Sequence, residues 1–258
     1  MPSTAGLFYY EQRGDRTDRP PILFIHGAGG THLNWPPQLR RMPGFRILAV
    51  DLPGHGNSGR VGKQRIADYM RCIHEFLIEM KIETALLVGH SMGSAIALTY
   101  AMNYPDRVAG LGLIGSGARL RVDPAILKMA SNPKLSADLV NVILDCSYSK
   151  KAGQSLKGLA RRRLLEAEPA VLYGDFQACD RFDIMDKLDE IQAPCLILCG
   201  MEDALTPLKY SEYLRDRINR STLEVISGAG HMVMVEQPEE SAEILKRFAL
   251  TLTKKSAS

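Results

Sequence analysis

Short apolar runs alternate with longer amphipathic stretches along most of this chain. The apolar runs have the length of β-strands and cover residues 7–11, 22–25, 46–50, 84–88, 110–114, 194–200 and 222–226. Between them, apolar residues at helical spacing predict helices over residues 63–80, 92–103, 207–219 and 238–252. Fully apolar strands that alternate with helices are typical of parallel strands buried on both faces. We therefore predict an α/β fold with a mostly parallel, doubly wound sheet.

This alternation stops in the middle of the chain. Residues 119–186 contain no convincing strand, only helical segments interrupted by prolines and glycines. The strand-and-helix rhythm resumes near residue 194. The pattern predicts one core domain built from residues 1–118 and 187–258, with a helical cap, or lid, inserted over residues 119–186. We use "the insertion" for residues 119–186 below.

Composition and charge narrow the class of protein. The chain has 258 residues, of which 45% are hydrophobic and 24% are charged, as expected of a soluble globular protein. Its net charge of +3 comes from 32 basic and 29 acidic residues that are mixed along the sequence, so a nucleic-acid partner is not expected. The one basic cluster, Arg161 to Arg163, is interpreted as the solvated face of a helix.

The cysteines and the N-terminus bear on location. The five cysteines form no ordered framework, which favours reduced thiols. Cys195 and Cys199 have the spacing C-x-x-x-C without paired histidines, so we expect no metal site there. The first fifteen residues lack the pattern of a signal peptide, and no apolar run has the length of a membrane span. A cytoplasmic protein is expected.

The motif with the clearest chemistry is Gly-His-Ser-Met-Gly at residues 89–93, which fits the pattern G-x-S-x-G. It follows the predicted strand 84–88 directly and opens the predicted helix 92–103. A serine at such a corner is held in a tight, strained turn that projects its hydroxyl. Glycines on either side leave room for the adjoining strand and helix. We therefore predict that Ser91 is a catalytic nucleophile.

A serine nucleophile needs a general base, and the base needs an orienting carboxylate. For a G-x-S-x-G serine in a strand-to-helix turn, the expected chain order is serine, acid, histidine. His231 lies in a glycine-rich loop between the last predicted strand and the last predicted helix. Asp203 follows the predicted strand 194–200, and its neighbour Glu202 is a rival that we expect to face solvent. The predicted triad is Ser91, His231 and Asp203.

Acyl transfer also needs two backbone N–H groups that bind the developing oxyanion. One should come from Met92, the residue after the nucleophile. The other should come from Ala28, in the glycine-rich loop that follows the predicted strand 22–25. A phosphate-binding loop is disfavoured because this loop lacks both the Lys-Ser/Thr of a P-loop and G-x-G-x-x-G spacing.

A second glycine-dense loop, residues 50–59, contains Asp51 and His55. We interpret it as structural, because Pro-Gly and Gly-Asn pairs favour tight turns and an aspartate binds local amides. His26 is likewise interpreted as a residue that fixes its loop by hydrogen bonds, and His90 as one that points away from the cleft.

With these residues in place, the sequence resembles the α/β-hydrolase superfamily, and in particular its capped carboxylesterase-like serine hydrolases. The resemblance covers about residues 20–118 and 185–252, and it rests on the segments FIHGAGG, VDLPGHGNSG, GHSMGS, CGMEDALTP and GAGHMVMVEQPEE. It implies hydrolysis of small carboxylic esters through an acyl-enzyme, without a cofactor. The expected partner is a small-molecule ester, and no sequence feature specifies an oligomeric state.

The superfamily contains other chemistries. Dehalogenases and epoxide hydrolases of this fold use an aspartate nucleophile, so Ser91 argues against both. A C–C bond hydrolase, a lactonase or a thioesterase of the same fold stays open, as does a hydrolase-fold ligand-binding receptor with little turnover. Substrate selection should depend on apolar side chains of the cap and of the loops beneath it. The candidate substrate-binding residues are Met92, Met232, Leu144, Leu172 and Phe176.

Overall fold

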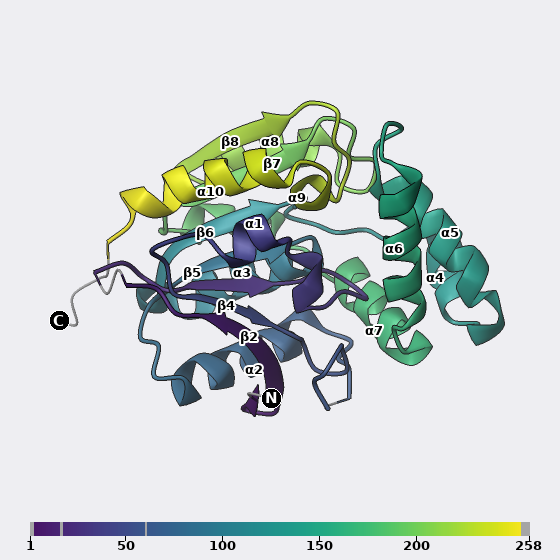
Figure 1. The fold of residues 1–258 in the computed structure, drawn as a ribbon, viewed down its shortest axis with the longest axis horizontal. Coiled ribbons are helices and arrows are strands. Elements are labelled where there is room, and N and C mark those ends of the chain that lie inside the picture. Colours follow the sequence, from purple (N-terminus) through teal and green to yellow (C-terminus); the bar gives the residue numbers. More distant parts are fainter. Residues whose placement is uncertain (1–2, 16–17, 60, 254–258) are drawn as a thin grey trace.

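A twisted sheet forms the centre of the molecule (Figure 1). The structure is a computed structural model that describes residues 3–15, 18–59 and 61–253, and within these residues the sheet has eight strands in the order β1-β2-β4-β3-β5-β6-β7-β8. β1 and β2 pair antiparallel, as do β2 and β4, and the other pairs are parallel. The strands are β1 (Ser3–Thr4), β2 (Leu7–Gln12), β3 (Ile22–Ile25), β4 (Ile47–Val50), β5 (Ala85–His90), β6 (Val108–Ile114), β7 (Cys195–Gly200) and β8 (Ser221–Ile226).

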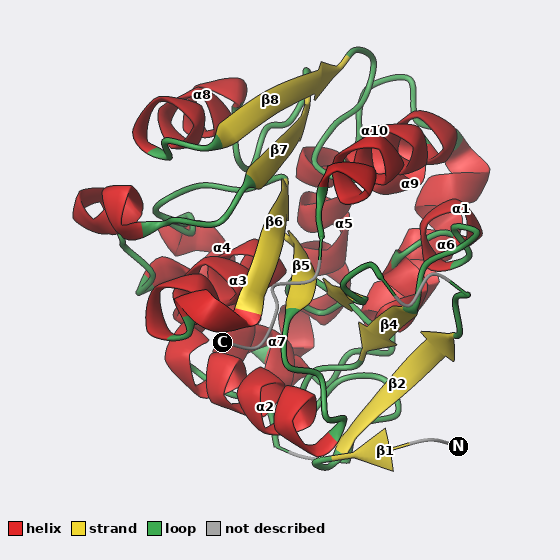
Figure 2. Ribbon diagram, turned by 90° about the vertical axis from the view of Figure 1, so that its left-hand side faces the viewer, coloured by secondary structure: helices red, strands yellow, loops and turns green. Residues whose placement is uncertain are grey.

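Helices cover both faces of this sheet (Figure 2). One face carries α2 (Ile66–Glu79), α3 (Met92–Asn103) and α8 (Leu208–Arg217), and the other carries α1 (Pro37–Arg40), α9 (Val233–Glu236) and α10 (Pro238–Thr251). Each face has its own hydrophobic core, with Tyr69, Phe76 and Tyr100 in the first and Phe24, Trp35 and Phe45 in the second. The predicted doubly wound α/β class is confirmed.

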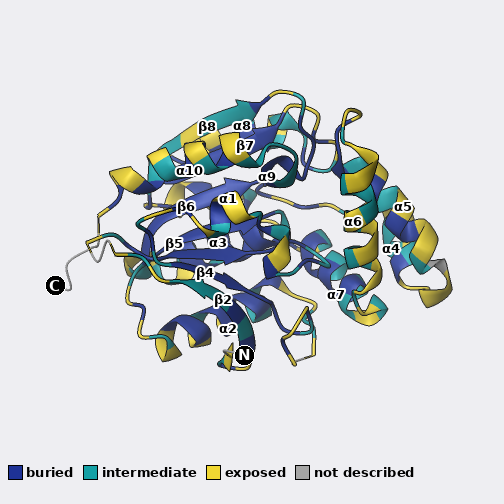
Figure 3. Ribbon diagram, viewed as in Figure 1, coloured by how far each residue is buried: buried dark blue, intermediate teal, exposed yellow. Residues whose placement is uncertain are grey.

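The insertion forms helices at the edge of the sheet where the parallel strands end (Figure 1). Its helices are α4 (Pro124–Ala130), α5 (Ser136–Ser147), α6 (Gln154–Leu165) and α7 (Pro169–Asp180). Their outer surfaces are exposed, whereas the central strands are buried (Figure 3). Single-turn or short 3₁₀ helices occur at His32–Asn34, Pro105–Arg107, Pro133–Leu135 and Met185–Glu190. None of the helices in the described ranges is both long and apolar enough to cross a membrane.

Strand register brings distant loops together at that edge. Ile25, the last residue of β3, pairs with Gly89 of β5, and His90 pairs with Ile114 at the end of β6. Farther along the sheet, Gly200 of β7 pairs with Ile226 of β8. The loops that follow β3, β5, β7 and β8 therefore emerge side by side beneath the insertion, and they carry the predicted site residues.

Candidate active site

Ser91 occupies a sharp turn between β5 and α3. Its backbone has φ 53° and ψ −117°, a left-handed conformation that is strained for a residue with a side chain. The turn is possible because its neighbours are small: a Cβ on Gly89 would overlap the Gly93 carbonyl, and one on Gly93 would overlap the Ile25 carbonyl. The Ser91 N–H donates to the Ile114 carbonyl at 2.9 Å, which ties the turn to β6. Ser91 remains partly exposed and lines a cavity.

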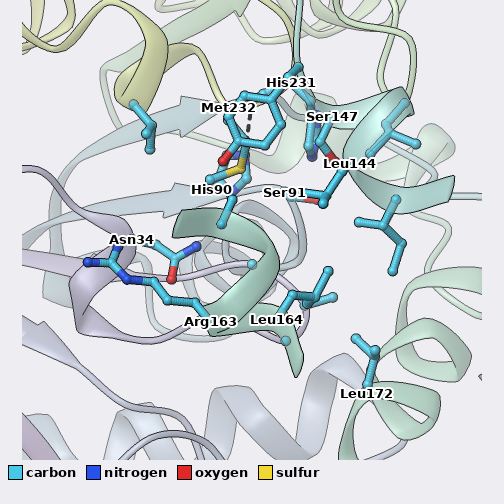
Figure 4. A pocket seen from close by; sticks show the side chains of 18 of the residues that line it. Asn34, His90, Ser91, Leu144, Ser147, Arg163, Leu164, Leu172, His231 and Met232 are labelled. Atoms are coloured by element: carbon cyan, nitrogen blue, oxygen red, sulfur yellow. Dashed lines mark hydrogen bonds between the residues drawn. The ribbon is translucent and has the colours of Figure 1, made fainter. Parts of the chain in front are cut away.

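The structure brings Asp203 and His231 together. The His231 Nδ1–H donates to Asp203 Oδ2 at 2.9 Å, and both side chains are almost fully buried. Asp203 follows β7, and it also accepts hydrogen bonds from the Leu205 and Thr206 amides and from the Thr206 hydroxyl, each at 2.8–2.9 Å. His231 lines the same cavity as Ser91 (Figure 4). The pairing fixes the Nδ1–H tautomer and leaves Nε2 as the acceptor.

The surroundings of Asp203 keep it ionised. Burial would raise the pKa of this carboxyl, but the facing His231 and the donors from Thr206 outweigh burial and hold the pKa below its usual range. The rival acid is placed differently: Glu202 is exposed, and its carboxylate accepts from the Lys150 amide at 3.2 Å. Of the two neighbours, Asp203 alone is paired with His231.

The loop that carries His231 is held by buried polar groups. The His90 Nε2–H donates to the His231 carbonyl at 3.0 Å, as the dashed line in Figure 4 marks. Burial lowers the pKa of His90 to about 3, so its ring is neutral. Glu236 accepts from the Gly230 amide at 2.8 Å, and Gly115, at φ 53°, leaves room for the His231 ring. His90 is thus a supporting residue for the loop of His231.

Two backbone amides near Ser91 are available to an oxyanion. Met92 is the first residue of α3, where helix geometry leaves N–H groups without an intrahelical partner. Ala28 lines the cavity in the loop after β3, which we call the oxyanion loop (residues 26–30). Among the described residues, neither the Met92 nor the Ala28 N–H donates a hydrogen bond, whereas the Gly29 and Gly30 amides both do.

His26 anchors the start of the oxyanion loop. Its Nδ1–H donates to the Gly27 carbonyl at 2.8 Å, and its Nε2 accepts from the Leu52 amide at 3.0 Å. Burial and the neighbouring His55 lower the pKa of His26 to about 4, so the ring is neutral and can donate and accept at once. This is the loop-fixing role expected from the sequence. Asp51 accepts from the His32 and Asn57 amides, a structural role that was also expected.

The cavity next to Ser91 has a volume of about 140 Å³ and lies between the core and the insertion. Four of the five predicted substrate-binding side chains line it, namely Leu144, Leu172, Phe176 and Met232. Met92 is placed differently. Its side chain is fully buried in the hydrophobic core on the face of the sheet that carries α2 and α3, and Met92 does not line the cavity. Met92 can therefore contribute its N–H to an oxyanion, but its side chain forms no part of the pocket wall.

One end of the cavity is polar. Asn34 and Arg163 line it there (Figure 4), and Arg163 donates to the Leu33 carbonyl at 3.0 Å. Arg161 and Arg162 are exposed, as expected for a solvated helix face, but Arg163 is partly buried against the site. The basic cluster therefore divides between solvent and the pocket.

Sequence reasoning missed one buried charge beside the site. Asp175 of α7 is fully buried and accepts a hydrogen bond from the Gly29 amide at 2.9 Å, within the oxyanion loop. A signal was present: Asp175 lies among apolar residues at helical spacing, between Leu172 and Cys179. A charged residue on the inward stripe of a helix is seldom buried without a partner.

Comparisons with known proteins agree with this architecture. A family model described as the alpha/beta hydrolase family matches residues 22–244. Monoacylglycerol lipase ABHD6 from Mus musculus is 26% identical over 264 positions, covering 93% of this chain and 79% of the lipase. A pimeloyl-acyl-carrier-protein methyl ester esterase from Neisseria meningitidis is 29% identical, covering 88% and 92%. The solved structure of a thermophilic esterase is 31% identical, with a TM-score of 0.81, and the match covers 95% of this chain and 98% of that one.

A doubly wound sheet with a serine at the corner after a central strand, and an Asp–His pair at the same edge, defines a protein of the α/β-hydrolase type. The family match spans most of the chain, and the chain belongs to the alpha/beta hydrolase family. The superfamily predicted from the sequence motifs is confirmed.

Proposed function

We propose that this chain is a carboxylic ester hydrolase that cleaves small esters through Ser91, His231 and Asp203. The observation that carries the proposal is the buried 2.9 Å pair of His231 and Asp203 on the wall of the cavity that Ser91 also lines. Relatives named as a lipase and as esterases support an enzyme of this class. They also favour an ester hydrolase over a receptor.

In the proposed reaction, His231 Nε2 removes the proton of the Ser91 hydroxyl as its oxygen attacks the ester carbonyl carbon. The Ala28 and Met92 amides hold the resulting oxyanion. Collapse of the tetrahedral intermediate breaks the bond to the alcohol, which leaves with the proton from His231. A water molecule, deprotonated by His231, then attacks the acyl carbon. The bond to the Ser91 oxygen breaks, His231 returns the proton to that oxygen, and the carboxylic acid is released. Asp203 keeps Nδ1 protonated and stabilises the imidazolium throughout.

We propose that the insertion, residues 119–186, acts as a cap on a core of residues 1–118 and 187–258. It supplies Leu144, Leu172 and Phe176 to the cavity that Ser91 also lines. Together with Met232, these apolar side chains would hold the acyl or alcohol group by excluding water from it. The small volume of about 140 Å³ favours short groups.

The test is steady-state turnover on a panel of p-nitrophenyl esters, lactones, thioesters and a vinylogous C–C substrate, with Ser91→Ala as the paired variant. We expect multiple turnovers on short esters and a loss of at least about 10³-fold in kcat for Ser91→Ala, with an unchanged melting temperature. Acylation that stops after one turnover would instead favour a receptor. Preference for the C–C substrate would favour that alternative, and full activity in the variant would refute the nucleophile.

A further inference from the structure

The Asp175 carboxylate lies at a junction of four segments. It comes from α7 in the insertion and has no exposed surface. Oδ2 accepts from the Gly29 amide of the oxyanion loop at 2.9 Å and from His55 Nε2, in the loop after β4, at 2.8 Å. Oδ1 accepts from the Tyr69 hydroxyl of α2 at 2.5 Å, and that hydroxyl accepts from the Lys63 amide.

His55 and Asp175 form a buried pair at this junction. Burial alone would lower the pKa of His55, but the Asp175 carboxylate outweighs burial and raises that pKa above its ordinary value. Both ring nitrogens of His55 face oxygen acceptors, Nδ1 the Pro53 carbonyl and Nε2 the Asp175 carboxylate, while Gly29 and Tyr69 donate the other hydrogen bonds to Asp175. Displacing any one partner would leave a buried polar group without a hydrogen bond, and the cost of doing so keeps the network rigid.

The Gly29 contact lies one residue from a proposed oxyanion donor. Gly29 has φ 61°, and its amide directly follows Ala28 in the chain. Because a peptide group is planar, a bond to the Gly29 N–H restricts the orientation of the peptide that joins the two residues, and so restricts the ψ angle of Ala28. The Gly30 amide donates to the Gly27 carbonyl at 3.1 Å and closes the turn. Asp175 thus holds the middle of a loop whose start is held by His26.

The same helix also forms the pocket. Leu172 and Phe176 lie one turn apart on α7 and line the cavity, and Asp175 lies between them in sequence. Gly174 brings the helix so close to the loop before α2 that a Cβ there would lie 2.8 Å from the Lys63 carbonyl oxygen. The position of α7 therefore determines both a pocket wall and the support of the oxyanion loop.

We propose that Asp175 is a positioning residue for catalysis: carried by the insertion, its carboxylate fixes the Gly29 amide and so aims the Ala28 N–H at the oxyanion. The inference rests on the proposed ester hydrolysis. It assigns to the insertion a part in transition-state stabilisation in addition to its part in the pocket wall.

The experiment compares Asp175→Ala with Tyr69→Phe in the full chain. Tyr69→Phe removes the partner of Oδ1 and weakens the same buried network, but it leaves the bond from Gly29 to Oδ2. For each variant, kcat and KM on p-nitrophenyl butyrate, the inhibition constant of a trifluoromethyl ketone and the melting temperature are measured. Asp175→Asn tests rescue, since its amide oxygen can still accept from Gly29.

We expect Asp175→Ala to lower kcat about tenfold or more, because loss of one oxyanion donor costs about 10²–10³-fold and a misdirected donor costs less. KM should stay within about threefold, and binding of the ketone, which mimics the oxyanion, should weaken by a factor similar to the loss in kcat/KM. Tyr69→Phe should keep kcat within about threefold despite a lower melting temperature. Asp175→Asn should recover most of the kcat that Asp175→Ala loses.

Three results would overturn the inference: an Asp175→Ala kcat within threefold of the native value, an equal loss in Tyr69→Phe, or a loss confined to KM. If Asp175→Ala does not fold, Asp175→Ser is measured in its place with the same expectations, since its short hydroxyl cannot reach Gly29. Absence of ester turnover in the native chain would refute the proposed function itself, so the two failures are distinguishable.

Discussion

The two sides of Ser91 are built differently. On the acid–base side, Asp203 and His231 come from loops of the core that follow β7 and β8, and the partners of Asp203 are its own loop and His231. On the oxyanion side, Ala28 sits in a loop after β3 whose middle is bound by Asp175, a residue of the insertion 146 positions away. The Asp203–His231 bond is made within the core, although the insertion contacts the loop of His231 where the Met232 N–H donates to the Ser147 carbonyl at 3.0 Å. The oxyanion loop is instead bound by a side chain of α7.

This difference suggests how substrate preference and catalytic power are linked in such a fold. Because the Asp203–His231 bond is made within the core and α7 takes no part in it, changes in α7 should leave proton transfer intact. The oxyanion side shares α7 with the pocket wall, so changes in α7 can affect both binding and the transition state. The following predictions test whether the two sides separate in this way.

The largest expected effect is on the acid–base side. Asp203→Asn should lower kcat by about 10³–10⁴-fold, because the amide cannot hold His231 in the tautomer that accepts a proton from serine. Glu202→Gln is the matched control, since its carboxylate is exposed and bound to the Lys150 amide. Steady-state kinetics on a short p-nitrophenyl ester measure both. If Glu202→Gln were the damaging change, the assignment of the acid would be wrong.

The acid–base side is also the part that the sequence predicts best. Each member of the predicted triad has a local sequence signal. Ser91 and Asp203 follow strongly apolar strands, and His231 stands in a glycine-rich loop, so these patterns place all three at one edge of the sheet. The short elements β1, α1 and α9 were not predicted, because two to four residues show no periodicity. Asp175 was missed because its partners are 106 to 146 residues away and no local motif marks them.

A second prediction concerns the neutral histidine on each side, His90 and His26. Their pKa values are lowered to about 3 and about 4, so below pH 6.5 the unfolded chain binds protons more readily than the folded chain. The free energy of unfolding should therefore fall as the pH drops from about 6.5 to about 4, at about 1.4 kcal/mol per pH unit for each histidine. Asp203, whose pKa is lowered, should add a further loss as the pH falls below about 4.

Urea unfolding at a series of pH values measures this dependence. His90→Gln keeps a hydrogen-bond donor but cannot titrate, so it should flatten the profile between pH 6.5 and 4, and His26→Gln should flatten it less. A native profile that is level over this range would contradict the assignment of both rings as neutral. A larger effect of His26→Gln would mean that the oxyanion side contributes more of the acid sensitivity.

A third, smaller effect is expected on the oxyanion side itself. Gly29→Ala places a Cβ at φ 61°, within 2.9 Å of the ends of the Leu164 and Leu172 side chains. The strained conformation costs about 1–2 kcal/mol, and a shifted loop should lower kcat about tenfold with little change in KM. Gly158→Ala is the control, because it lies on α6 with nothing within 4 Å of its Cβ. Equal kinetics for the two variants would mean that the loop tolerates displacement.

The smallest expected effect is on substrate preference. It tests whether the two contributions of α7, the pocket wall and the support of the oxyanion loop, can be altered separately. Leu172→Ala removes apolar volume from the cavity but leaves Asp175 and its partners in place. It should shift the kcat/KM ratio of p-nitrophenyl octanoate to acetate toward the longer ester by about three- to tenfold, since each buried methylene contributes about 0.8 kcal/mol. Trifluoromethyl ketones of both chain lengths report whether the oxyanion is still held, and Leu165→Ala, exposed on α6, is the control. An unchanged chain-length preference would remove Leu172 from the pocket. A uniform loss on both esters would instead mean that the wall and the oxyanion loop cannot be altered separately, because they move with the same helix.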